Sequence, residues 1–175
     1  LWRFKASAER MHIEEFRARF QLHLEAWIGR KASSYARYTG DPFLLSLFNY
    51  TSRLASGGGK RIRPYVAYLI WKSLAENSDD DQSIIRFLVA LELFHLFCLV
   101  HDDMIDRGTQ RYDLPTVQRY VASELRRRGQ LGDHDHIGDS QALLLGDMLF
   151  SWSHEAINDG DFSCEVREEA RRYFH

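Results

Sequence analysis

The sequence has little of what marks several specialised protein classes. Only two cysteines occur among 175 residues, Cys98 and Cys164, so a disulfide framework is excluded and a reducing compartment is expected. Three prolines and eleven glycines exclude collagen-like and low-complexity chains. Lysine and arginine total 23 against 25 aspartates and glutamates, so the basic excess of a general nucleic-acid binder is missing. We therefore expect a cytoplasmic protein with no nucleic-acid partner.

Long uninterrupted apolar runs are also missing. The most apolar stretch, residues 87–100, contains Glu92 and His95, whereas a bilayer helix needs about 20 apolar residues. The first residues show no signal-peptide core. These features predict no stable membrane insertion. The 45% share of hydrophobic residues is ordinary, and the length predicts one domain over residues 1–175 with its own core.

Apolar residues recur with helical period along almost the whole chain. They predict helices over about residues 13–38, 42–54, 65–76, 82–106, 116–127, 139–158 and 165–174. Asp41 followed by Pro42 is typical of a helix start, and the three glycines at residues 57–59 end the second helix. Because residues 84–100 are apolar on nearly every side, the fourth helix belongs at the centre of a bundle. The predicted fold class is all-α.

Three acidic residues, Asp102, Asp103 and Asp106, stand at the end of this apolar helix, where the negative end of the macrodipole disfavours them. The side chains of Asp102 and Asp106 are four residues apart, about 6 Å between Cβ atoms. They repel unless a cation lies between them, and a magnesium ion (Mg2+) binds carboxylate and phosphate oxygens. Glu92 and His95 continue the same face. The pattern favours a metal site, with a solvated acidic helix end as the alternative.

A basic loop forms the second informative group. Three glycines are followed by Lys60, Arg61 and Arg63, and Pro64 then marks the start of a helix. Loop amides, a helix N-terminus and cationic side chains together suit a phosphate or diphosphate. The loop is not a Walker P-loop, because no Ser or Thr follows Lys60 and no strand precedes the glycines. A solvated basic turn is the alternative interpretation.

In combination these groups resemble the trans-isoprenyl diphosphate synthases, the polyprenyl synthetase family. The matching pieces, in order, are residues 58–64, Glu92 with His95, residues 101–106, Arg111, residues 114–117, residues 138–140 and residues 145–147. The resemblance implies a bundle of long helices around a central cleft, usually a homodimer. It also implies a Mg2+-dependent, head-to-tail condensation of an allylic diphosphate with isopentenyl diphosphate.

The resemblance also implies roles for the basic group. Lys60, Arg63 and His95 would hold isopentenyl diphosphate. The family usually has paired arginines followed by glycine, whereas here Arg111 is followed by Tyr112 and Asp113. The second arginine of that pair helps to grip isopentenyl diphosphate, so this departure predicts weaker binding of that substrate or a changed function.

The acidic group takes the other substrate by the same resemblance. Asp102 and Asp106 would bind magnesium that bridges the allylic diphosphate, with Asp103 assisting and Arg111 contacting the same diphosphate. The aromatic Phe97, five residues before Asp102, would limit the product to a short chain of fifteen to twenty carbons. An ideal helix places Cys98 nearer the aspartate face.

The sequence also allows other interpretations of the function. The family's second aspartate-rich motif and its lysine-threonine pair lie downstream of this sequence, which therefore resembles the N-terminal half of a synthase. A non-catalytic or regulatory subunit homologue is the main alternative to an enzyme. A terpene cyclase is disfavoured, because it would not need the basic loop with Lys60 and Arg63. A phosphohydrolase with a His101-Asp102 pair needs a further histidine on a facing helix, and upstream only the distant His12 and His23 are found.

Two smaller features complete the sequence expectations. Gly146 and Asp147 are expected to permit a close helix approach and a buried polar contact. Residues 129–138, which include the run of Asp and His at residues 133–136, are expected to form a solvated loop, with metal chelation as the less favoured alternative.

Overall fold

A computed structural model describes residues 11–74 and 81–174 of the chain. This part is almost entirely helical, as the sequence predicts, with one two-residue hairpin and one 3-10 turn. The elements are α1 (Ile13–Ala36), α2 (Pro42–Ser56), α3 (Ile62–Leu74), α4 (Asp81–Ile105), β1 (Gln110–Arg111), β2 (Leu114–Pro115), α5 (Val117–Arg127), α6 (His134–Ala156), η1 (Ile157–Asp159) and α7 (Cys164–Arg172).

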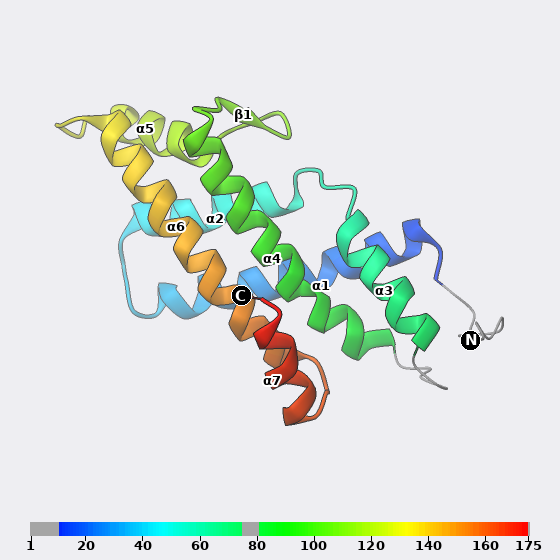
Figure 1. Ribbon diagram of the computed structural model, residues 1–175. Helices are drawn as coiled ribbons and strands as arrows, with labels where there is room; N and C mark the ends of the chain where they lie inside the picture. The colour runs from blue at the N-terminus through cyan, green and yellow to red at the C-terminus, as the bar shows by residue number, and fades with distance from the viewer. Residues whose placement is uncertain (1–10, 75–80, 175) are drawn as a thin grey trace.

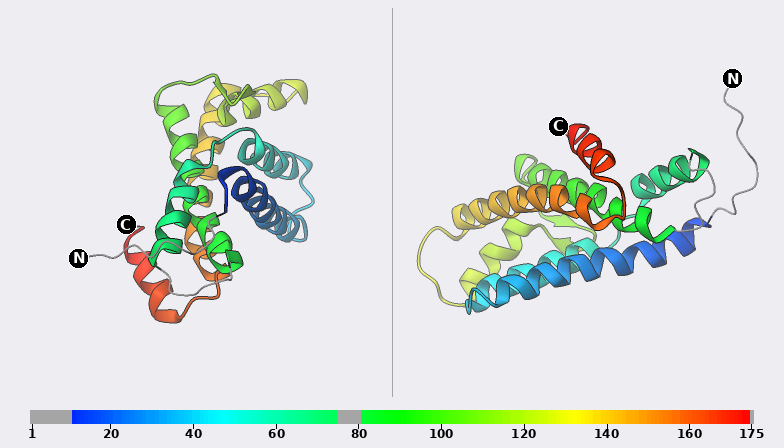
Figure 2. Two further views of the ribbon diagram at one scale, coloured as in Figure 1. Left: turned by 90° about the vertical axis from the view of Figure 1, so that its right-hand side faces the viewer. Right: turned by 90° about the horizontal axis from the view of Figure 1, so that it is seen from below.

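Helix α4 is the central element, and the other long helices are arranged around it. It lies side by side with α6 in one layer, while α3 packs along the other side of α4 (Figure 1). Helices α1 and α2 form a second layer behind them, as the turned views show (Figure 2). Helix α5 packs on α6, and α7 lies across the front of the lower end. The position of α4 confirms the sequence prediction of a central helix.

The core lies between the two layers and is rich in aromatic rings. On α1, Phe16 stacks on Phe20 with ring centroids 5.5 Å apart and also meets Tyr68 of α3 at 5.2 Å. Further along α1, Trp27 meets Trp152 of α6 edge to face at 5.6 Å. All five rings are buried. Full burial of a side chain of this size is worth about 1.5–3 kcal/mol or more, so the one-sided apolar stripe of α1 fixes that helix against the layer of α4.

Two helix boundaries differ from the sequence prediction, each for a local reason. Helix α3 begins at Ile62 rather than residue 65, since the Tyr65 amide already donates to the Arg61 carbonyl oxygen at 3.1 Å. Helix α6 begins at His134, so the predicted loop over residues 129–138 was wrong in its second half. The Asp133 carboxylate accepts a hydrogen bond from the His136 amide and thereby caps the helix. The predicted end of the third helix, at about residue 76, falls within residues 75–80, outside the described residues.

The hairpin between α4 and α5 was not predicted. Strands β1 and β2 pair antiparallel, with Arg111 opposite Leu114. Tyr112 and Asp113 connect them with φ angles of 52° and 61°, the left-handed pair that a two-residue type I′ turn requires. Glycine and asparagine adopt this region more easily than a tyrosine does, so the sequence gives no turn signal here.

Helix α4 is also long and apolar enough to cross a membrane, by length and composition alone, although the sequence predicts no stable membrane insertion. Within the described residues it is the one helix with this property. Of the most apolar 18-residue segment of α4, 56% is buried inside the bundle, between α1, α3 and α6. A buried core helix meets the same criterion, so the apolarity of α4 is explained by its central position.

The contact between α5 and α6 depends on the absence of a side chain at Gly138. A Cβ atom there would lie 2.5 Å from the backbone carbonyl oxygen of Gln118 and 3.4 Å from the Cβ of Ala122. We expect Gly138→Ala to lower the free energy of unfolding by about 2–4 kcal/mol, since backbone rather than a flexible side chain must move. Urea denaturation followed by circular dichroism measures the change.

The matched control is Gly29→Ala in the middle of α1, where an added Cβ meets nothing within 4 Å. This substitution should raise the free energy of unfolding by about 0.5–1 kcal/mol through helix propensity alone. Equal effects of the two substitutions would contradict the close approach of α5 and α6.

Candidate functional site

The acidic group lies at the C-terminal end of α4. The Asp102 and Asp106 side chains are exposed, whereas Asp103 is only 6% exposed. Although α4 ends at Ile105, the Asp106 amide still donates to the Asp102 carbonyl oxygen at 2.8 Å. The helical spacing therefore continues to Asp106, and the two exposed carboxylates lie on one face of the helix.

The chain reverses immediately after this pair. Arg107 adopts a φ of 54°, and the Gly108 amide donates back to the Asp103 carbonyl oxygen at 2.8 Å. This is the hydrogen bond of a Schellman motif, which closes a helix end. A Cβ at position 108 would lie 2.9 Å from an Asp103 carboxylate oxygen, so the glycine permits the tight return of the chain. The reversal carries the chain into the hairpin.

Asp103 is paired with the arginine of the hairpin. The Arg111 Nη2 and Nε atoms donate to the two Asp103 carboxylate oxygens at 2.7 and 3.1 Å. This bond to Asp103 is the main reason why the pKa of Arg111 lies above its ordinary value, and burial opposes it. The amide of Gln118 donates to the Asp103 carbonyl oxygen at 2.8 Å. Asp103 therefore fixes the hairpin on α4.

The two exposed carboxylates fit a magnesium ion by their chemistry. Within residues 11–74 and 81–174, neither Asp102 nor Asp106 forms an ion pair, and this part of the chain holds no cluster of three or more His, Cys, Asp or Glu that could bind a metal. Magnesium is usually held by one or two protein carboxylates, with water and phosphate oxygens in the other positions. Asp102 and Asp106 therefore match a shared magnesium–diphosphate site better than a closed protein cage.

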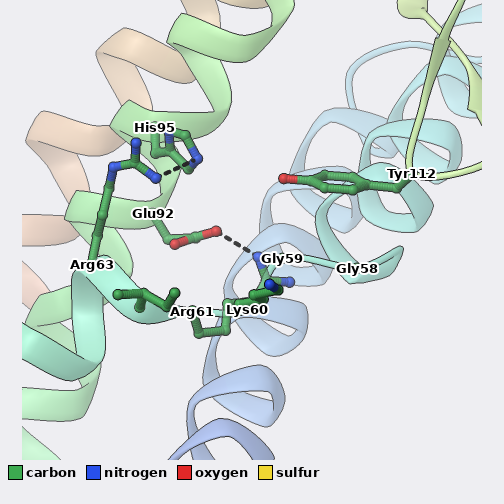
Figure 3. Close-up of a pocket in the computed structure, with 9 residues that line it drawn as sticks. Gly58, Gly59, Lys60, Arg61, Arg63, Glu92, His95 and Tyr112 are labelled. Carbon is green, nitrogen blue, oxygen red and sulfur yellow. Dashed lines mark hydrogen bonds and ion pairs between the residues drawn. The ribbon is translucent and has the colours of Figure 1, made fainter.

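The basic group lines a separate pocket of about 320 Å³. It lies between the glycine loop, the start of α3, the middle of α4 and the tip of the hairpin (Figure 3). The lining residues are Gly58, Gly59, Lys60, Arg61, Ile62, Arg63, Glu92, His95 and Tyr112. The structure thus brings Lys60, Arg63 and His95 together, as their predicted shared role requires.

One of the three expected cations, Arg61, is not available to an anion in this arrangement. Its side chain is turned inward, with the residue 6% exposed, and it pairs with the buried Glu92 of α4 at 2.5 Å. It also donates to the carbonyl oxygen of Ala55 and, at 2.8 Å, to the side chain of Gln21. The prediction that residues 60, 61 and 63 act as one basic group was therefore wrong for Arg61. Glu92 could have indicated this pair from the sequence, because a carboxylate in an otherwise apolar helix needs a partner of opposite charge or a hydrogen-bond donor.

The remaining cations, Lys60 and Arg63, are exposed at the pocket. The Arg63 Nη1 atom lies 3.1 Å from His95 Nε2, one of the two contacts drawn in the close-up (Figure 3). The pKa of His95 is lowered from its ordinary value, first by burial and then by the neighbouring Arg63 charge. Its imidazole is thus kept neutral at physiological pH.

Tyr112 forms the wall of the pocket opposite α4. Its ring lies against Gly58, where a Cβ would be 3.5 Å from the ring, and its hydroxyl points into the pocket (Figure 3). The side chain that follows Arg111 therefore reaches the pocket, as the family pattern implies, but it brings a hydroxyl instead of a positive charge. Asp113, at the turn, adds an anion to the same hairpin.

Cys98 connects the acidic and basic parts of the site. It lies on α4 between His95 and Asp102, and burial raises the pKa of its thiol. The Asp102 charge raises this pKa further, while the Arg63 charge lowers it. The geometry shows how the two groups are related: Arg63 contacts His95, and His95 is seven residues, about two helical turns, from Asp102 on the same side of α4.

An apolar wall lies next to the acidic group, between α4 and α6. The Phe97 ring packs edge to face on His101 at 4.8 Å and meets Phe150 of α6 at 5.2 Å. His101 itself fits against α6 because Gly146 has no side chain, since a Cβ there would lie 2.1 Å from His101 Nε2. The expected close helix approach at Gly146 is confirmed. The expected buried polar contact is wrong, because the Asp147 side chain is 64% exposed.

The run of residues 133–136 supplies no metal site. Asp133 caps α6, and Asp135 pairs with Arg126 at 2.7 Å. The His134 Nε2 atom lies 2.6 Å from the Gln130 carbonyl oxygen. Each of these side chains stabilises a helix end or a neighbouring segment.

A known protein family matches most of this chain. The family described as Polyprenyl synthetase matches residues 45–172, which include the basic loop, both aspartates of the exposed pair and the hairpin. The chain belongs to the polyprenyl synthetase family.

Several curated relatives match this chain. It is 33% identical over 115 residues to a short chain isoprenyl diphosphate synthase of Methanocaldococcus jannaschii, a match that covers 64% of this chain and 28% of the relative. It is 32% identical over 112 residues to a geranylgeranyl diphosphate synthase of Methanosarcina mazei, covering 64% and 29%. The chain therefore spans about a third or less of the length of these curated relatives.

A solved structure extends the comparison to the fold. The crystal structure of geranylgeranyl pyrophosphate synthase from Corynebacterium glutamicum, complexed with isoprenyl diphosphate and magnesium, matches with a TM-score of 0.82 and 27% identity. The match covers 93% of this chain and 46% of that one. The helical bundle of this chain thus has the fold of slightly less than half of that solved synthase.

The buried Arg61–Glu92 pair gives a stability prediction for this chain. Glu92→Leu should lower the free energy of unfolding by about 3–5 kcal/mol, because it leaves the Arg61 charge buried without its partner. The double variant Arg61→Met with Glu92→Leu should recover most of this loss, since two apolar side chains of similar volume need no counter-charge. Urea denaturation of the two variants and the parent chain measures both values.

The control for surface electrostatics is Glu14→Leu, which removes an exposed partner of Arg17 at 3.2 Å. This change should alter the free energy of unfolding by less than about 1 kcal/mol. A double variant that is no more stable than Glu92→Leu alone would contradict the assignment of the cost to the unpaired Arg61.

Proposed function

We propose that this chain forms the substrate-binding part of a prenyltransferase that condenses an allylic diphosphate with isopentenyl diphosphate. The observation that carries the proposal is that two different diphosphate holders lie along one side of α4, since Arg63 contacts His95 and His95 is about two helical turns from Asp102. Asp102 and Asp106 offer free carboxylates to magnesium, and Lys60 with Arg63 offer direct cations in a pocket. Two binding sites of different chemistry suit two diphosphates with different roles: the allylic diphosphate is the leaving group, whereas the diphosphate of isopentenyl diphosphate only holds that substrate in place.

Each group has a stated task in this reaction. When bound, magnesium neutralises the charge that grows on the departing allylic diphosphate. Asp102 and Asp106 orient that diphosphate toward the end of α4. Lys60 and Arg63 hold isopentenyl diphosphate so that its double bond faces the allylic carbon, which orients the two reactants. The allylic C–O bond breaks, the double bond attacks the resulting cation, and a proton is lost.

The apolar wall has the task of keeping water from the cation. Phe97 of α4 and Phe150 of α6 pack with ring centroids 5.2 Å apart, and Phe94 extends the wall at 5.4 Å from Phe97. Rings of this kind shield a carbocation from water and attract it through their faces. The hairpin supports the site from outside, because Arg111 anchors it on Asp103 while Tyr112 closes the pocket.

A second function is favoured by a specific departure from the family. Tyr112 and Asp113 replace a cation and a glycine at the tip of the hairpin, so the pocket holds one positive charge fewer than the family pattern. The alternative is a non-catalytic or regulatory subunit of such a synthase, which keeps the fold and binds a catalytic partner. Association as a homodimer also stays a prediction for this chain.

Incorporation of radiolabelled isopentenyl diphosphate separates these two functions. The chain is incubated with an allylic diphosphate and magnesium, either alone or with the Methanocaldococcus jannaschii synthase, and the products are separated by chromatography. Elongated product from the chain alone supports the enzyme. No product alone, together with a changed rate or product length of the added synthase, supports the regulatory subunit.

Magnesium-dependent binding tests the acidic pair directly. We expect magnesium to tighten binding of an allylic diphosphate to the parent chain. Asp102→Asn or Asp106→Asn should reduce this magnesium-dependent gain in affinity at least about tenfold, since each removes one charged ligand. Isothermal titration calorimetry with and without magnesium measures the gain. Asp139→Asn, an exposed aspartate of α6, is the matched control and should leave the gain intact.

Product length tests the apolar wall. We expect Phe97→Ala to lengthen the product, because it removes a ring that fills the space between α4 and α6. Chromatography of the products formed from an allylic diphosphate and isopentenyl diphosphate measures their chain length. Phe87→Ala, which removes a ring that packs on Phe162 away from Asp102, is the control; equal product lengths from the parent and Phe97→Ala would contradict the assignment.

A further inference from the structure

The contact between Arg63 and His95 fixes the hydrogen-bonding role of the histidine. The distance from Arg63 Nη1 to His95 Nε2 is 3.1 Å. A guanidinium has five N–H donors, no acceptor, and stays protonated at any physiological pH. Nε2 must therefore accept the hydrogen bond, so the ring is neutral and its proton is on Nδ1.

We propose that His95 is a positioning residue, a neutral acceptor that fixes the Arg63 guanidinium for the anion, and that it does not itself act as a cation on the diphosphate. Arg63 is exposed near the N-terminal end of α3 and has many rotamers available to it. A fixed acceptor on the rigid central helix selects one of them before the anion arrives. This reduces the side-chain ordering that binding would otherwise require. The inference rests on the proposed function only for the identity of the anion.

The surroundings of His95 favour the neutral ring. The charged and titratable groups that face it come from every element around the pocket: Lys60 and Arg61 from the loop, Arg63 from α3, Glu92 from α4, and Arg111 and Tyr112 from the hairpin. The Glu92 charge is already paired with Arg61, so the remaining field is that of cations. Burial and these cations keep the pKa of His95 below its ordinary value, and Glu92 only partly opposes them.

The alternative role predicts the opposite dependence on pH. If a protonated His95 gripped the diphosphate directly, affinity would rise as the pH falls and the ring gains its charge. If His95 is the acceptor for Arg63, protonation places two donors against each other and releases Arg63. The contribution of His95 to affinity is then present above the lowered pKa and lost as the pH falls through it. The sign of the pH dependence distinguishes the two roles.

The tautomer of His95 in the anion-free chain is the first test. Two-bond nitrogen–proton NMR spectra of the 15N-histidine-labelled chain at pH 7.5 report which ring nitrogen carries the proton. The signal is assigned by its disappearance in His95→Gln. We expect the Nδ1–H tautomer, with Nε2 as the acceptor. An Nε2–H tautomer or a charged ring at this pH would overturn the proposal, whether or not the chain binds any diphosphate.

Binding of inorganic diphosphate without magnesium is the second test. EDTA is present so that only the cationic pocket contributes, and affinity is measured by calorimetry between pH 5.5 and 8. His95→Gln places an amide oxygen where Nε2 stood, whereas His95→Asn places one nearer the position of Nδ1, too short to reach Arg63. We expect His95→Asn to weaken binding about tenfold at pH 7.5, and His95→Gln less than about threefold.

The pH profile completes the second test. Protonation of diphosphate itself affects every variant equally, so the ratio of parent to His95→Gln affinity isolates the histidine. We expect this ratio to fall as the pH decreases. A ratio that rises at low pH, or equal losses in His95→Gln and His95→Asn, would overturn the proposal. Absence of diphosphate binding by the parent chain at every pH would contradict the proposed function, while the tautomer still decides the role of His95.

Discussion

The buried ion pair between Arg61 and Glu92 is the interaction on which the arrangement of the site depends. It joins the end of the glycine loop to the central helix through two buried side chains, and the guanidinium also donates to Gln21 of α1 and to the Ala55 carbonyl oxygen. Two buried charges are tolerated only when they are paired and hydrogen-bonded. With Arg61 held inward, the residues on either side of it, Lys60 and Ile62, are exposed, and the loop presents its remaining cations to the pocket.

Helix α4 serves as the common wall of every part of the site. Going along it, Glu92 fixes the loop, His95 meets Arg63, Phe97 faces α6, and Asp102 begins the acidic end. A helix held on several sides by α1, α3 and α6 keeps such groups in constant relative positions. The hairpin adds the last wall, because the pair of Asp103 with Arg111 attaches it to the same helix. The site is thus assembled from distant segments around one rigid element.

The helices were predictable because each has a strong local signal. The stripe of Phe16, Phe20 and Leu24 marks α1, and Asp41 with Pro42 marks the start of α2 by a cap that the structure confirms. The start of α6 was missed because residues 129–138 are rich in Gly, Asp and His, and the cap at Asp133 was taken for part of a loop. The hairpin was missed since its turn uses Tyr112, which carries no turn preference.

By itself, the sequence determined the all-α class, the order of the family motifs and the spacing of Asp102 and Asp106, because periodicity, caps and helical spacing act between near neighbours. Only the tertiary structure decided which charges are free. Arg61 turns inward and Arg63 outward although they are two residues apart, and Asp103 is paired with Arg111 while its neighbour Asp102 is exposed. These choices depend on which side chains other helices bring into contact, and adjacent residues of one helix face different neighbours.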